Sequence, residues 1–385
     1  MRRLLAASIP PVALCSLIAV LSALPVLAPL ALAPPARADE GMWTYDRAPV
    51  ALIQERHGFA PSREWLDHLR LSSVDVNASA SFVSPDGLIL TNHHVAMSAI
   101  QRISTAERNL LRDGYRARSR EDELPLPAFT ARVLVSTEDV TDRVEAAVKP
   151  NATPAQALAQ REAAKAAIAA EAEKATGLTC EIVSLYGGAQ HWLYSAKLYT
   201  DVRLVCAPEL QAAFFGGDWD NFCYPRHDLD FTFLRAYENG QPAKVEHYLK
   251  IDPDGVDDGE LVFVSGHPGR TARLHTVAGL EWERDLSYPA KLERSRHTRE
   301  VLRQYSARSA EAARRARQMI YGLGNSLKAM EGEHAGLRDP ELMAIKLADE
   351  KALRAAVAAD PALAAKYGGA WERAAAAYAW ARAHD

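Results

Sequence analysis

The sequence predicts a β-rich unit followed by an α-helical unit, and two patterns support this division. Between about residues 79 and 265, short runs of β-branched and aromatic residues recur at intervals of roughly ten residues, which is typical of a barrel or sandwich. After about residue 278 the chain is rich in Ala, Arg, Glu and Leu and is expected to be helical. With 385 residues, 48% of them apolar, the chain is long enough for more than one hydrophobic core.

The charge and composition exclude several classes of protein. Lys and Arg total 45 against 49 Asp and Glu, so no basic excess indicates a nucleic-acid partner. The apolar and charged fractions are those of a globular protein rather than of a disordered chain, a collagen or a coiled coil. A polytopic membrane protein is also excluded, because only one apolar stretch is long enough to span a bilayer.

That apolar stretch opens the chain, and residues 1–38 are expected to be a removed export signal. Two arginines precede the apolar run, and Ala36-Arg37-Ala38 fits a small-x-small cleavage site. Pro25 and Pro29 interrupt the run and argue against a stable membrane-spanning helix, although an uncleaved N-terminal anchor is an alternative. We expect cleavage after Ala38, no membrane span in the mature chain, and a location in the periplasm, at the cell surface or outside the cell.

An oxidising compartment permits one disulfide among the cysteines that remain after cleavage, Cys180, Cys206 and Cys223. Cys180 and Cys206 flank a predicted hairpin and are the preferred pair. Three buried free thiols are an equally good interpretation.

The β-rich unit is expected to begin with a helix at 62–70 and a hairpin of two strands at 79–83 and 88–92. Between these strands, Ser84-Pro85-Asp86-Gly87 has proline at the second position and glycine at the fourth, which predicts a tight β-turn. A helix is expected at 153–176, with Pro154 in its first turn. Further strands are predicted at 129–135, 181–185, 191–197, 202–206, 231–237 and 261–265. The helical unit is predicted to contain helices at 280–319, 326–337, 340–359 and 361–384.

The most informative motif is Thr91-Asn92-His93-His94, directly after the hairpin. It delivers an imidazole just past a strand, the context in which chymotrypsin-type serine peptidases place their general base. There, a neutral imidazole takes the proton of a serine hydroxyl, and a buried carboxylate fixes its tautomer. Aligning the final histidine assigns this role to His94. A hydrogen-bonded loop histidine pair and a metal site are the alternatives, although the metal site lacks a third ligand at plausible spacing.

The carboxylate partner is expected in the polar, Gly-rich loop that runs directly into the strand at 231–237. Asp230 stands at the start of this strand, where it can be buried against an imidazole without entering the core. Asp218, Asp220 and Asp228 are rivals, and spacing alone does not choose among the four.

Together these segments make the chain resemble peptidase family S46, the bacterial dipeptidyl-peptidases 7 and 11 and their relatives. The segments that carry the resemblance are 39–43, 81–94, 201–205, 216–233, 266–271 and 325–328. The resemblance implies a chymotrypsin-like double β-barrel serine peptidase with an inserted helical domain. Such an enzyme removes dipeptides from the free N-termini of peptides, commonly as a homodimer. We expect no metal and no cofactor.

The resemblance also assigns roles to single residues. His94 matches the general base and Asp230 the carboxylate that orients it. Asn221 and Asn325 match asparagines that hold the α-amino group of the substrate, because their carboxamide oxygens can accept hydrogen bonds from an ammonium. Phe222 belongs to the same site, at a position that the family usually fills with tryptophan.

The nucleophile is expected to lie outside this chain. In the family it is a serine in a Gly-Gly-Asn-Ser-Gly-type loop of the second barrel, beyond residue 385, and no such loop occurs here. Gly324-Asn325-Ser326 is only superficially similar, because its flanks are predicted to be helical.

The chain is therefore expected to be the truncated N-terminal part of a longer enzyme. Residues 39–278 would form the first barrel, with a helical insertion near 153–176, and residues 279–385 would begin the helical domain. Without the serine the chain is expected to be inactive alone. A non-catalytic secreted remnant, or a protein that binds peptides or serves as a scaffold, is the alternative. The preference for a hydrophobic or an acidic residue at the cleavage site stays open.

Overall fold

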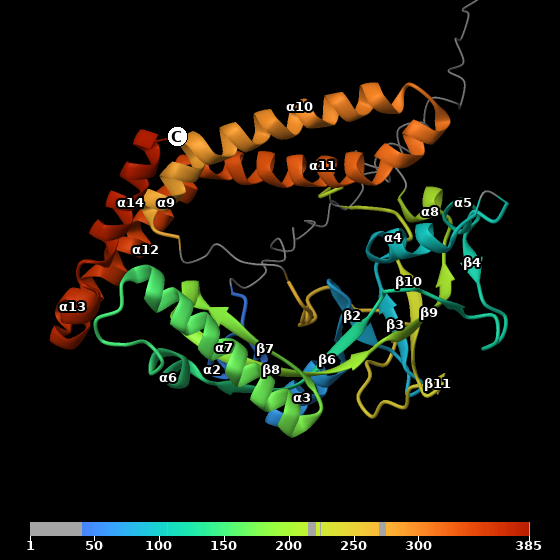
Figure 1. The fold of residues 1–385 in the computed structure, drawn as a ribbon, viewed down its shortest axis with the longest axis horizontal. Helices are drawn as coiled ribbons and strands as arrows, with labels where there is room; N and C mark the ends of the chain where they lie inside the picture. Colours follow the sequence, from blue (N-terminus) through green and yellow to red (C-terminus); the bar gives the residue numbers. More distant parts are fainter. Residues whose placement is uncertain (1–40, 106, 215–220, 224, 269–274, 385) are drawn as a thin grey trace, which may run out of the picture. The chain divides into compact units, whose positions relative to one another are not determined.

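The computed structural model describes residues 41–105, 107–214, 221–223, 225–268 and 275–384 (Figure 1). The predicted export signal lies outside these residues, as do Asp218 and Asp220. The chain divides into two units, residues 1–42 with 256–261, and residues 43–255 with 262–385. The elements given below all belong to the second unit. Among the described residues, no helix is both long enough and apolar enough to cross a membrane.

Eleven strands of the described residues form one sheet in which every neighbouring pair is antiparallel. Across the sheet the order is β4 (Tyr115–Arg116), β9 (Asp201–Ala207), β10 (Thr232–Glu238), β3 (Leu88–Thr91), β2 (Ser79–Phe82), β1 (Ser73–Asp75), β6 (Ala131–Asp139), β8 (Gln190–Tyr199) and β7 (Thr179–Leu185). In addition, β5 (Leu124–Pro125) pairs with β9, and β11 (Gln241–Pro242) pairs with β10. The predicted β-rich unit is thus a single antiparallel sheet.

The hairpin of β2 and β3 confirms the predicted turn. The backbone N–H of Val83 donates to the carbonyl of Leu88 at 2.8 Å and closes the turn. Gly87 has φ of 64°, in the left-handed region, and a Cβ at this position would lie 2.9 Å from the carbonyl oxygen of Ala243. Only glycine fits here without strain, because it has no Cβ.

The main hydrophobic core packs between the strands and α4 (His93–Ile103), the helix that follows β3. Ile89, Leu204 and Leu234 contribute from the strands, and Ile100 contributes from α4, each of them inaccessible to solvent. Apolar residues at 96, 97, 99 and 100 form the buried face of α4, which fixes the start of this helix against the sheet. Burial of this kind is the main source of stability in a globular fold.

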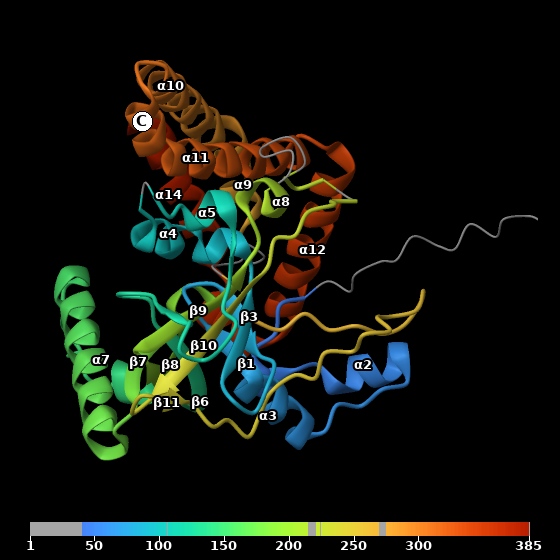
Figure 2. The ribbon, with the colours of Figure 1, turned by 90° about the vertical axis from the view of Figure 1, so that its right-hand side faces the viewer.

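A second, smaller core lies under α7 (Pro154–Thr176), which covers β7 and β8 (Figures 1 and 2). Its predicted start is confirmed: Thr153 and Gln156 form a capping box, in which each side chain bonds the other residue's backbone N–H. The helix ends at Gly177, which is left-handed with φ of 70°.

The other helices of the sheet region are short. They are η1 (Tyr45–Arg47), α2 (Val50–His57), α3 (Arg63–Ser72), α5 (Leu110–Asp113), α6 (Thr141–Glu145), η2 (Tyr186–Gly188) and α8 (Leu210–Ala213). The predicted helix at 62–70 is α3, and its N-terminus is capped by the hydroxyl of Ser62.

From residue 277 to residue 384 the described chain is almost entirely helical, as the sequence predicts, but some predicted bounds are wrong: the helix predicted at 280–319 is interrupted after Ser306, no break separates 319 from 326, and 361–384 is divided in two. The elements are α9 (Val277–Trp282), a π-helical turn η3 (Glu283–Ser287), α10 (Tyr288–Ser306), α11 (Ala310–Leu337), α12 (Pro340–Ala359), α13 (Pro361–Tyr367) and α14 (Ala370–His384). Figure 1 shows α10 and α11 side by side. The side chains of Ser309, Asp339 and Asp360 cap α11, α12 and α13. Each cap fixes the residue at which a helix begins. The periodicity of apolar residues alone does not show these positions.

Two predictions in the β-rich unit are also wrong. Residues 261–265 do not form a strand, because none of their backbone groups joins a ladder among the described residues; Val264 is fully exposed. Cys180 and Cys206 are free thiols rather than a disulfide. The hairpin between them exists, but β9 then pairs with β10 instead of β8, so the two cysteines lie on strands far apart in the sheet order. A sequence with high strand propensity does not reveal whether a partner strand is present, or which strand the partner is.

Candidate active site

The fold brings the imidazole of His94 to the end of the β2–β3 hairpin. Thr91 is the last residue of β3, and its hydroxyl donates to the carbonyl of Ser79 at 3.0 Å, which fixes the strand end. Asn92 then leaves the sheet in an extended conformation and α4 starts at His93. The His94 side chain is on the first turn of α4 and is about half exposed, at 54%.

Asp230 lies directly against His94. Its Oδ2 is 2.6 Å from His94 Nδ1, and its Oδ1 accepts the backbone N–H of His94 at 3.0 Å. The pairing of β10 with β3 explains the contact, because Thr232 is opposite Thr91 and Asp230 comes two residues before Thr232. The Asp230 side chain is only 12% exposed. The predicted proximity of the imidazole and the carboxylate is confirmed.

The surroundings of Asp230 favour its charged form. Burial by itself raises the pKa of the carboxyl group, but hydrogen bonds from the imidazole and the backbone N–H of His94, with the charges of His94 and Arg226, outweigh burial and lower the pKa of Asp230 below its ordinary value. A carboxylate that accepts from Nδ1–H holds the imidazole in the tautomer whose Nε2 carries a lone pair. The Nε2 of His94 is thereby prepared to accept a proton.

His93 has a different environment from its neighbour. Its side chain is only 1% exposed, and burial lowers its pKa, while the negative charge of Asp230 and a bond to the carbonyl of Pro208 act in the opposite direction. His93 is therefore neutral at pH 7, inside the protein, whereas His94 faces outward. The described residues contain no group of three His, Cys, Asp or Glu side chains that could hold a metal ion.

The two asparagines expected at the substrate's amine also lie in contact. Asn221 Nδ2 donates to Asn325 Oδ1 at 3.1 Å, and the Nζ of Lys328, one turn further along α11, donates to the backbone carbonyl of Asn221 at 3.0 Å. Phe222 follows with its ring 66% exposed and φ of 58°. Residues 104 positions apart in the sequence are thus joined, and both Asn325 and Phe222 are exposed.

The structure also separates the rival residues. Asp228 forms an ion pair with Arg226 at 2.8 Å and is not the residue that meets His94. Ser326 lies within the continuous helix α11 rather than on a tight turn, which agrees with the expectation that it is not the nucleophile.

Comparison with known proteins identifies the family. The sequence profile of the family Peptidase S46 matches residues 38–385. The chain belongs to peptidase family S46. It is 33% identical over 336 residues to an Asp/Glu-specific dipeptidyl-peptidase of Shewanella putrefaciens, an alignment that covers 82% of this chain and 45% of the relative. It is 30% identical over 350 residues to dipeptidyl-peptidase 7 of Phocaeicola vulgatus, covering 82% of this chain and 47% of the relative.

The fold resembles a solved S46 structure. Porphyromonas endodontalis DPP11 in complex with the dipeptide Arg-Asp superposes with a TM-score of 0.72 and 26% sequence identity, covering 83% of this chain and 49% of DPP11. The described sheet and helices therefore have the architecture of this family. The chain spans about half the length of the relatives that it matches.

Asn92 is a site residue that the sequence analysis missed. It occupies the N-cap position of α4 but makes no side-chain cap. Instead its Nδ2 donates to Asp230, at 3.1 Å to the backbone carbonyl and 3.3 Å to Oδ2. The signal was present in the sequence, because an asparagine that could cap the helix stands two residues before the expected base. Asn92 is therefore placed to hold Asp230 in position.

Asn92→Ala is expected to raise the pKa of Asp230, because the charged carboxylate loses a donor. The free energy of unfolding should fall by about 1–2 kcal/mol, as for the loss of a hydrogen bond to a charged group. Carbon-13 NMR titration of the Asp230 carboxyl and denaturant unfolding measure the two effects. Asn151→Ala, in an exposed turn, is the matched control and should change neither. An unaltered Asp230 titration in Asn92→Ala would show that Asn92 has no positioning role.

Proposed function

We propose that this chain supplies the general base and the orienting carboxylate of a serine-type dipeptidyl-peptidase. The observation that carries the proposal is the 2.6 Å contact between His94 Nδ1 and Asp230 Oδ2, made by a side chain that is 54% exposed. In the first step Nε2 takes the proton of a serine hydroxyl while the oxygen attacks the peptide carbonyl. The resulting imidazolium is stabilised by Asp230 and returns the proton to the leaving amine.

The serine is proposed to come from a second chymotrypsin-like barrel, together with the donors that stabilise the oxyanion. The sheet of this chain would be the first barrel of the pair, from residue 39 to residue 278, and the helices from residue 279 would begin the helical domain. Two features of the chain support this arrangement: the His94 side chain is exposed, and the relatives are about twice as long as the part that this chain matches. We further propose that the enzyme is exported to the periplasm or cell surface and acts as a homodimer.

The amine end of the substrate is proposed to bind at Asn221 and Asn325. Asn325 Oδ1 accepts a hydrogen bond from Asn221 Nδ2 at 3.1 Å. The ammonium group of a substrate would donate further hydrogen bonds to the carboxamide oxygens of both asparagines. The exposed ring of Phe222 offers its face to the same cation. Recognition of a free amine at a fixed distance from His94 would restrict cleavage to the second peptide bond, which explains why a dipeptide is released.

The proposal is tested by completing the enzyme. We define the chimera as a fusion in which residues 39–385 replace the matched half of Porphyromonas endodontalis DPP11. Fluorogenic dipeptides with either a hydrophobic or an acidic second residue are the substrates. The chimera is expected to release dipeptides, whereas the 385-residue chain alone should give no turnover above the uncatalysed background, because it lacks the covalent step. Turnover by the isolated chain that Ser326→Ala abolishes would contradict the proposal.

A second candidate function is peptide binding without catalysis. It is favoured by the Asn221–Asn325 pair, which can recognise a free N-terminus without any nucleophile. Under this alternative the isolated chain would bind dipeptides with a free amine, and a correctly folded chimera would remain inactive.

A further inference from the structure

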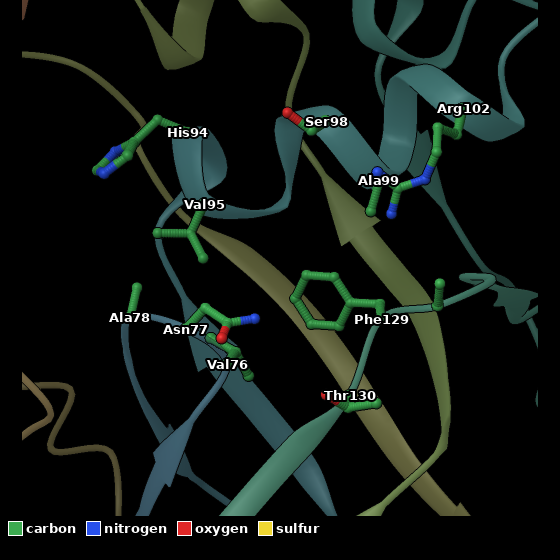
Figure 3. A pocket seen from close by; sticks show the side chains of 11 residues that line it. Val76, Asn77, Ala78, His94, Val95, Ser98, Ala99, Arg102, Phe129 and Thr130 are labelled. Carbon is green, nitrogen blue, oxygen red and sulfur yellow. The ribbon is translucent and has the colours of Figure 1, made fainter. Parts of the chain in front are cut away.

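A pocket of about 500 Å³ lies beside His94 and has no role in the mechanism above. One wall is a face of α4, formed by Val95, Ser98, Ala99 and Arg102, which are spaced as neighbours on a helix surface. The other walls are the turn at 76–78 and the segment 128–130 before β6. Figure 3 shows His94 at one end of the pocket and Arg102 at the other.

Arg102 gives this pocket a positive charge. Its side chain is exposed and extends toward Phe129 (Figure 3). The guanidinium donates to the carbonyl of Pro127 at 3.4 Å and forms no ion pair with any carboxylate of the described residues. Most of its donors are therefore available to a ligand, and a guanidinium matches a carboxylate in shape as well as in charge.

The backbone around the pocket is held in an uncommon conformation. Asn77 and Ala128 both line the pocket, and both are left-handed, with φ of 62° and 58°. Residues other than glycine are rarely left-handed, and such residues concentrate at binding sites. Both loops therefore hold a backbone conformation that costs free energy for a residue with a side chain.

The position of the pocket relative to His94 indicates which part of a peptide it would hold. This step rests on the proposed function. The amine end of the substrate is assigned to Asn221, which the segment 221–230 connects to Asp230. The pocket contains no residue of that segment and lies along α4 instead. The chain beyond the scissile bond would therefore extend over α4.

The length of the pocket sets the length of the peptide. Arg102 is eight residues beyond His94 on α4, which corresponds to roughly 12 Å along the helix axis. An extended peptide advances about 3.4 Å per residue, so three residues cover most of this distance and the Arg102 side chain covers the remainder.

We propose that this pocket binds the leaving part of the substrate and that Arg102 recognises a carboxylate on the third residue after the scissile bond. The carboxylate is either the C-terminus of a pentapeptide or the side chain of Asp or Glu in a longer peptide. The preferred substrates are therefore short peptides, or longer ones with an acidic residue at the fifth position.

The test measures binding to the 385-residue chain, so that it does not depend on catalysis. The probes are acetyl-Ala-Ala-Ala as the free acid and as the amide, because the acetyl group prevents binding at the amine site. In low salt the free acid is expected to bind about three- to fivefold more tightly, as for a partly exposed ion pair. Arg102→Gln should remove this preference, and Arg303→Gln, an exposed arginine on α10, should keep it. Ligand-observed NMR titration gives the affinities, and circular dichroism verifies that each variant is folded.

Acetyl-Ala-Ala-Glu amide distinguishes the two sources of the carboxylate. If this probe binds as tightly as the free acid, Arg102 accepts a side-chain carboxylate as well as a C-terminal one. If it binds only as weakly as the amide, Arg102 accepts the C-terminal carboxylate alone. Both outcomes support the proposed pocket. Equal binding of acid and amide by the wild-type chain, or a preference that persists in Arg102→Gln, overturns the proposal. If acid is preferred while the chimera is inactive, the proposed catalysis fails and the peptide site stands.

Discussion

His94→Ala is expected to lower kcat for dipeptide release by the chimera at least 10⁴-fold, because His94 is the proposed acceptor of the serine proton. In serine peptidases, loss of the base removes roughly as much catalysis as loss of the nucleophile, on the order of 10⁶-fold. KM should change little, since the amine site at Asn221 and Asn325 does not include His94. Steady-state kinetics with a fluorogenic dipeptide measures both constants.

The matched control for this variant is His297→Ala, which removes an exposed imidazole from α10. Its kcat should stay within about twofold of the parent chimera, as for a surface substitution away from any site. Retention of more than a tenth of the activity in His94→Ala would show that another group is the base.

Asp230→Asn is expected to lower kcat of the chimera about 10⁴-fold, although the side chains have nearly the same shape. An asparagine can present its NH₂ group to Nδ1, which moves the imidazole proton to Nε2 and removes the lone pair needed for catalysis. This magnitude is the one known for the equivalent change in a chymotrypsin-type enzyme. Glu238→Gln, at the far end of β10 and paired with Lys197, is the control and should be close to neutral in kcat.

The same variant has a pH-dependent effect on stability. The pKa of Asp230 is lower in the folded protein than its ordinary value, so its charged form contributes stability at neutral pH, and this contribution is lost as the pH falls through the lowered pKa. The difference in unfolding free energy between wild type and Asp230→Asn is therefore expected to be greatest near neutral pH and to shrink below about pH 4. A difference that is constant over this range would mean that the pKa of Asp230 is not lowered.

The sequence predicted the parts of the site that depend on local structure. The turn at 84–87 and the strand that follows it place His94 just past a strand end, and both follow from neighbouring residues. The helix α4 that begins at His93 was not predicted. The choice of Asp230 among four candidate acids could not be made from residue spacing and came from the family resemblance, because in the fold it depends on the register of β10 against β3, a contact between segments about 140 positions apart. For the same reason the sequence did not show that Asn92 bonds to Asp230 rather than capping its own helix.

The two errors in the β-rich unit also concern long-range pairing. Residues 261–265 have the side-chain pattern of a strand, but the pattern does not reveal whether a partner strand is present. Cys180 and Cys206 flank a real hairpin, yet the chain leaves that hairpin and pairs β9 with β10. Local propensity predicts where strands and helices form. Which of their side chains come into contact depends on the pairing of strands that are distant in the sequence.

The central claim is that Asp230 holds His94 with its proton on Nδ1 and a lone pair on Nε2. Nitrogen-15 NMR of the imidazole in the 385-residue chain tests this directly, because the chemical shifts of the two ring nitrogens distinguish the tautomers. Above the imidazole pKa we expect a protonated Nδ1 and an unprotonated Nε2, and a change of tautomer in Asp230→Asn. A proton on Nε2 in the wild-type chain, or the same tautomer in both proteins, would contradict the account.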